Sequence, residues 1–124
     1  MKLNPECVRD ILLTIENYPV PMNLDFYEFS SLLPQYSKDE ILYCCKRLHE
    51  ANYLNLNYIT VIKNSKPELD TIGDLTFFGH EFLENIKDDT NWKLVKSKAI
   101  QVGSFALPIL QQIASSLILN KIKQ

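Results

Sequence analysis

Side chains able to bind a metal ion or act as nucleophiles are few and widely scattered in this sequence. The three cysteines are Cys7, Cys44 and Cys45, and the two histidines are His49 and His80. Neighbouring residues point about 100° apart on a helix, so Cys44 and Cys45 are not oriented to hold one ion together. The sequence also lacks the C-x2-C and H-x3-H spacings of zinc sites. We therefore expect buried thiols and no metal ion.

His80 comes closest to a catalytic pattern. It precedes Glu81, but no nucleophile or second ligand lies near it in the sequence. The carboxylates of Glu81, Glu84, Asp88 and Asp89 fit helix starts and an exposed helix face better than a metal site. The sequence also has no glycine-rich phosphate-binding loop. We predict a protein that is not an enzyme and holds no cofactor.

Basic residues suited to nucleic acid are concentrated in two short segments. Five of the seven basic residues that precede residue 87 lie within residues 38–47 and 63–66. Lysine and arginine neutralise phosphates, and tyrosine can donate a hydrogen bond to a phosphate oxygen. The candidate DNA-binding residues are therefore Lys38, Tyr43, Lys46, Arg47, Lys63 and Lys66.

The charge balance of the chain opposes DNA binding. Residues 1–86 hold seven basic and thirteen acidic residues, a net charge of −6, whereas residues 87–124 hold six lysines and two aspartates, a net charge of +4. DNA-binding domains are usually basic. Asp39 and Glu40 would also face phosphates, although Glu40 has a helix-capping role. The same surface could dock a protein instead, and both alternatives stay open.

Helix signals near the start of the chain begin the framework that positions these residues. Asn4 and Pro5 are typical of a helix start, and Pro19 ends the apolar stripe that follows them. A short helix is expected at about residues 27–33, with Leu32 among its inward-facing residues.

A capping box marks the next helix. Ser37 and Glu40 predict an N-cap hydroxyl that accepts the Glu40 amide hydrogen, while the Glu40 carboxylate turns back to Ser37. This helix is expected at about residues 37–51, and Asn52 suits the left-handed position that follows it. It carries the first four candidate DNA-binding residues.

A hairpin and a further helix complete the expected module. Residues 53–62 and 69–75 have the alternation and the β-branched and aromatic content of strands, and the polar residues 63–68 connect them. The order helix, helix, turn, helix, hairpin, helix is that of a winged helix-turn-helix. In such modules the second helix of the pair, here residues 37–51, enters the major groove. We predict an α+β fold with this module at residues 1–86 and the connecting turn as its wing.

Residues 87–124 are predicted to form a helical extension, with Trp92 as a core residue that anchors it to the module. The last helix is apolar on more than one face, although polar residues and Pro108 within it disfavour a membrane span. A fully packed helix in a monomer is one alternative. We favour a homodimer, with interface residues Leu110, Ile113, Leu117 and Ile118.

Two stretches of the sequence resemble a known family. Residues 75–79, LTFFG, resemble the L-T-x-x-G segment with which many bacterial winged helices leave the wing and start the next helix. Residues 75–92, LTFFGHEFLENIKDDTNW, and residues 1–12 are similar to a prophage-associated family of unknown function, the YjcQ-like proteins. The resemblance covers roughly residues 1–98 and implies a winged helix, but no activity.

The functional prediction follows from the fold and from the basic residues. Asn4, Glu6, Arg9 and Asp10 interrupt any secretion signal, so we expect a cytoplasmic protein. We predict a DNA-binding or transcription-linked regulator of a phage or mobile element, with double-stranded DNA as its partner. The alternative is an adaptor that uses the same scaffold to bind a protein. The DNA sequence, the protein partner and any sensed ligand are left open.

Overall fold

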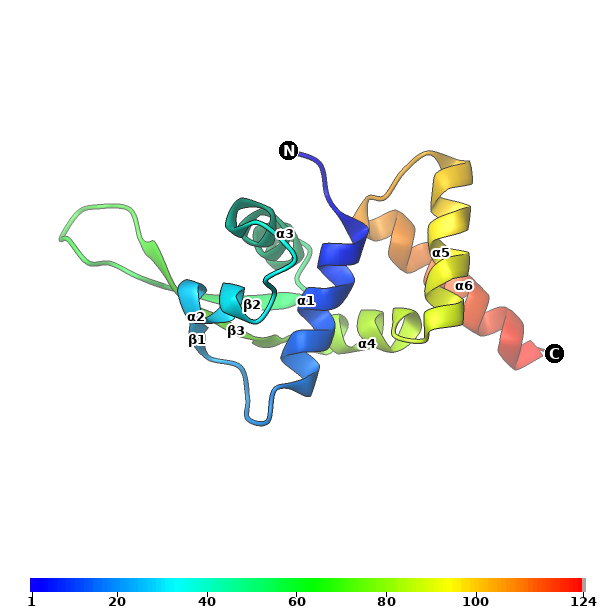
Figure 1. The fold of residues 1–124 in the computed structure, drawn as a ribbon, viewed down its shortest axis with the longest axis horizontal. Coiled ribbons are helices and arrows are strands. Elements are labelled where there is room, and N and C mark those ends of the chain that lie inside the picture. Colours follow the sequence, from blue (N-terminus) through cyan, green and yellow to red (C-terminus); the bar gives the residue numbers. More distant parts are fainter. Residues whose placement is uncertain (124) are drawn as a thin grey trace.

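The structure, a computed structural model, describes residues 1–123 as a winged-helix module followed by two helices (Figure 1). The wing hairpin projects at one end of the molecule, and the two C-terminal helices lie at the other end. The elements in chain order are α1 (Pro5–Asn17), β1 (Leu24–Asp25), α2 (Phe26–Ser31), α3 (Lys38–Glu50), β2 (Leu54–Ile59), β3 (Glu68–Leu75), α4 (Phe77–Ile86), α5 (Asp89–Val102) and α6 (Leu107–Lys123).

The helix starts follow the capping signals in the sequence. The Asn4 side chain accepts hydrogen bonds from the amides of Glu6 and Cys7, at 3.0 and 3.4 Å. The Ser37 hydroxyl accepts one from the Glu40 amide at 3.1 Å, as predicted. The Glu40 carboxylate, however, accepts a hydrogen bond from Asn4 Nδ2 at 3.2 Å. Its side chain therefore ties α3 to the start of α1.

The predicted hairpin is confirmed, and a third strand joins it. β2 and β3 pair antiparallel, and β1 pairs with the other edge of β3, giving the order β1-β3-β2. β2 ends at Ile59, three residues earlier than expected, so the wing loop covers residues 60–67. Asn52 has a φ of 65°, as predicted from its place after α3.

One apolar core joins the module and the extension. Residues of α1, α3 and α4 pack over the sheet, and the same cluster continues into Val95 and Ala99 of α5 and Leu110 and Ala114 of α6. Leu32, expected to face inward, is instead 41% exposed: it caps the C-terminus of α2, and the next residue, Leu33, packs in the core. The division at residue 86 stays a prediction, since buried side chains lie on both sides of it.

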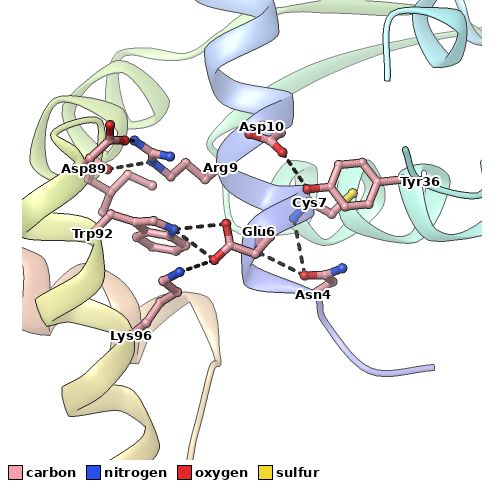
Figure 2. Close-up of polar contacts among 10 residues, drawn as sticks. Asn4, Glu6, Cys7, Arg9, Asp10, Tyr36, Asp89, Trp92 and Lys96 are labelled. Atoms are coloured by element: carbon pink, nitrogen blue, oxygen red, sulfur yellow. Dashed lines mark hydrogen bonds and ion pairs between the residues drawn. The ribbon is translucent and has the colours of Figure 1, made fainter. Parts of the chain in front are cut away.

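The extension is held against α1 by a cluster around Trp92 (Figure 2). Trp92 is 2% exposed, and its indole N–H donates to the Glu6 carboxylate at 3.2 and 3.3 Å. Lys96 also donates to Glu6. Burial raises the pKa of Glu6, but the hydrogen bonds from Lys96 and Trp92 more than offset this, so the pKa lies below its ordinary value. The predicted anchoring role of Trp92 is confirmed.

Arg9 completes this joint on the side of α4. Its guanidinium donates to the carbonyl oxygens of Ile86 and Lys87, at 3.0 and 2.7 Å, and to the Asp89 carboxylate at 2.7 Å. A cation that binds the last carbonyl groups of a helix satisfies acceptors that the helix itself leaves unpaired. Arg9 is therefore committed to the end of α4.

Candidate nucleic-acid interface

The helix-turn-helix of the module consists of α2 and α3, with residues 32–37 between them. α3 buries Ile41, Cys44, Cys45 and Leu48 against the core. The opposite face, at helical spacing, carries Asp39, Tyr43, Lys46 and Glu50. Lys46 is exposed, and Tyr43 is half-buried.

Lys38 lies at the first position of α3, beside an exposed aromatic ring. Its Nζ is 4.0 Å from the centroid of the Tyr27 ring, and Tyr27 on α2 is 73% exposed. A cation over the face of a tyrosine ring is favourable. Tyr27 therefore belongs to this surface. Only the fold links it to Lys38, eleven residues away, so sequence spacing did not single it out.

Arg47 makes an ion pair within α3. Its Nη1 is 2.9 Å from Glu50 Oε2, and both side chains are more than half exposed. Exposed pairs of this kind stabilise a protein by less than about 1 kcal/mol, so Arg47 can exchange partners. α3 carries three basic and three acidic residues, so the helix has no net charge.

The wing supplies the remaining two candidate residues. Lys63 and Lys66 are exposed in the loop between β2 and β3, which projects away from α5 and α6 (Figure 1). A turn at the tip is closed by the hydrogen bond from the Ser65 amide to the Ile62 carbonyl at 3.0 Å, with Asn64 at a φ of 69°. Ile62 and its neighbour Val61 are also exposed.

An N-terminal arm, residues 1–3, lies beside the outward face of α3. Met1 lines a hollow of about 240 Å³ together with residues 39, 42, 43 and 46. Leu3 lines a second hollow of about 420 Å³ with Tyr43, with Arg47, Glu50 and Ala51 at the end of α3, and with residues 106–108 at the start of α6. Tyr43 borders both hollows. Sequence spacing alone gives no sign that this arm lies at the candidate interface.

The other chemically capable residues do not gather into a site. All three cysteines are buried as free thiols, and burial raises the pKa of Cys45. His80 is exposed at the start of α4. Within residues 1–123, no group of three or more His, Cys, Asp or Glu side chains is arranged to hold a metal ion. In the same range, no helix is both long enough and apolar enough to cross a membrane.

The predicted dimer surface on α6 is partly used inside the chain. Leu110 is fully buried, so its assignment as an interface residue is wrong: α6 packs along α4 and α5, and these two helices cover the Leu110 side chain. Ile113 and Leu117 pack at the edge of the core, and Ile118 is half-buried. An open α5–α6 groove of about 400 Å³ remains, lined by Lys98, Val102, Ile109, Gln112, Ile113, Ser116, Leu117 and Asn120.

A solved structure with this arrangement of elements is the crystal structure of a PadR family transcription regulator from hypervirulent Clostridium difficile R20291. The two structures align with a TM-score of 0.51 and 19% sequence identity, over 79% of this chain and 98% of the other. At this identity the similarity establishes the fold. The predicted winged helix with a C-terminal helical extension is thereby confirmed.

Sequence comparison places the chain in a family. No curated protein matches it. The sequence model of a family described as "Hypothetical protein (DUF2513)" matches residues 2–105, which include α1 to α5 and the turn that follows α5. The YjcQ-like and prophage assignments stay predictions. The matched range covers most of the chain, so the protein belongs to the DUF2513 family.

Proposed function

We propose that the protein is a DNA-binding regulator that places α3 in the major groove and the wing along the adjacent backbone. The main support is the exposure of four lysines on these two elements, Lys38, Lys46, Lys63 and Lys66. The similarity to a protein described as a transcription regulator adds to it. We further propose that this regulator acts in a phage or mobile element, which is the setting that the sequence resemblance implies.

Removal of one lysine from each element tests the proposal. Lys46→Ala and Lys63→Ala are each expected to weaken binding to a mixed-sequence duplex and to lower the slope of log affinity against log salt by about one. Fluorescence anisotropy at several salt concentrations measures both quantities. Lys93→Ala on the exposed face of α5 is the matched control, because it removes the same charge from the other end of the molecule.

Docking to a protein is the second candidate function, and two observations favour it. α3 has no net charge, and the hairpin exposes Ile59 at the end of β2 and Val61 and Ile62 in the wing loop. If Lys46→Glu and Lys63→Glu together left duplex affinity unchanged, docking would replace DNA binding as the best explanation. Absence of duplex binding at low salt would have the same meaning, because electrostatic attraction is then strongest.

A two-fold dimer through the α5–α6 groove would pair two such modules. Val102 borders the groove and is 62% exposed, and Leu94 lies two turns before it on α5 at 44% exposure. In a two-fold contact the same patch meets itself, so each buried side chain counts twice. Helix-turn-helix regulators use such pairs on two half-sites.

Val102→Asp is expected to convert the dimer to a monomer, because it places a charge at the border of the apolar groove that the contact would bury. Sedimentation velocity at micromolar concentration measures the change. Ile100→Asp is the matched control, since Ile100 is equally exposed, at 67%, but lies on a different face of α5 from the groove. A wild-type chain that sediments as a monomer at high concentration would contradict the dimer.

A further inference from the structure

The N-terminal arm occupies the side of α3 that a DNA duplex must approach. Met1 shares one hollow with Asp39, Leu42, Tyr43 and Lys46, which follow one another along the outward face of the helix. Leu3 shares the next hollow with Tyr43 and Arg47. The arm therefore extends alongside most of α3. A duplex that receives α3 in its major groove meets the arm at the same time.

The base of the arm is fixed in this position. Asn4 caps α1, and its Nδ2 donates to the Glu40 carboxylate on α3 at 3.2 Å. Leu3 is half-buried and packs against the core. Met1 and Lys2 beyond it are exposed. Lys2 is therefore carried on an anchored segment, and contact with a phosphate would order few additional residues.

The net charge of α3 explains why the positive charge of Lys2 matters for DNA binding. The basic residues of α3 are balanced by Asp39, Glu40 and Glu50, so the helix itself supplies no net attraction for DNA. Lys2 makes no ion pair with another described residue. A lysine beside a neutral recognition helix provides the positive charge that the helix lacks. Phosphate contacts of this kind set register and affinity without reading sequence.

We infer that the N-terminal arm is part of the DNA interface and that Lys2 contacts a backbone phosphate at the edge of the groove that receives α3. This inference rests on the proposed function and extends it from α3 and the wing to a third element. The partner is double-stranded DNA, recognised here through its phosphates.

The test compares Lys2→Gln, Lys2→Arg and Lys93→Gln in the full chain, with no residues added before Met1. Lys2→Gln is expected to weaken binding to a mixed-sequence duplex about fivefold at low salt and to lower the salt slope by about one, as for one lost phosphate contact. Lys2→Arg should restore both values. Lys93→Gln should match the wild type. Urea unfolding should be unchanged in all three, because Lys2 and Lys93 are exposed.

Lys46→Gln in the same assay separates failure of this inference from failure of the proposed function. If Lys46→Gln weakens binding and Lys2→Gln does not, the arm lies outside the interface and the DNA-binding function stands. If Lys2→Gln strengthens binding, the arm obstructs the groove and the inference is overturned. If the wild-type chain binds no duplex at low salt, both fail.

Discussion

Replacing Gly79 by alanine is expected to destabilise the protein by about 3 kcal/mol or more, the upper end of the range for overpacked sites. A Cβ atom at this position would lie 2.0 Å from the carbonyl oxygen of Tyr53 and 2.9 Å from its carbonyl carbon. Both atoms belong to the backbone, so no side-chain rotation relieves the overlap. Alanine is better than glycine inside a helix by only about 1 kcal/mol, which does not offset the clash.

The Tyr53 carbonyl is also held in place by its own contacts. It accepts a hydrogen bond from the Thr76 amide at 3.1 Å, and the Tyr53 ring stacks on Phe82 with centroids 5.0 Å apart. A shift that made room for a methyl group would disturb the start of α4 as well as the end of the α3–β2 connection. The close approach of α4 to Tyr53 therefore requires glycine at position 79.

Urea unfolding followed by circular dichroism measures the effect as a lower midpoint with an unchanged slope. Gly103→Ala is the matched control. Gly103 has a φ of 86°, but a Cβ there meets nothing within 4 Å. The left-handed backbone alone should cost about 1 kcal/mol. Equal losses at the two glycines would show that contact with Tyr53 is not what requires Gly79.

Local signals in the sequence predicted most of the module. The predicted capping residues Asn4 and Ser37 each start a helix, and Asn52 takes the left-handed position after α3. These interactions involve residues within four positions of one another, so the sequence carries them directly. The L-T-x-x-G resemblance also located the start of α4, but the reason for its glycine became visible only in the contact with Tyr53.

The features that the sequence did not predict depend on contacts between distant segments. β1 has two residues, too few to show a periodic pattern, and it exists because Leu24 pairs with Ile72. The place of the arm beside α3 depends on how α1 packs on α3. Leu110 was assigned to a dimer surface because the apolar pattern of a helix does not say which neighbour covers it. Here α4 and α5 cover it within the same chain.

The candidate site shows the same division. Sequence spacing identified the basic residues of α3 and the wing, all of which the structure places on these two elements. It did not single out Tyr27 beside Lys38, because only the fold brings these two residues together. The pairing of Arg47 with Glu50 is an exception: these residues are three positions apart on α3, yet the pair was not predicted. Both alter the strength of any phosphate contact, because a cation that already has a partner must exchange it.

Replacing Trp92 by alanine is expected to cost about 4 kcal/mol, in the range for a fully buried aromatic residue. The indole lies between α1 and α5, with the Arg9 guanidinium 5.8 Å and the Lys96 ammonium 5.5 Å from the ring. Its removal opens a cavity at the joint and takes from Glu6 one of its hydrogen-bond donors. The contact between the extension and the module should weaken more than any other part of the structure.

Urea unfolding of three variants separates the contributions. Trp92→Ala loses both packing and the hydrogen bond, whereas Trp92→Phe keeps most of the apolar volume and loses only the N–H donor to Glu6, for which we expect a cost of about 1–2 kcal/mol. Ile100→Ala is the control, because Ile100 lies on the same helix but is 67% exposed and does not line the α5–α6 groove, and it should cost less than about 1 kcal/mol. If Trp92→Ala proved no less stable than Ile100→Ala, the joint would contribute little and the extension would be held chiefly by the packing of α6 on α4. If Trp92→Ala does not fold at all, the difference between Trp92→Phe and Ile100→Ala still reports whether the hydrogen bond to Glu6 stabilises the joint.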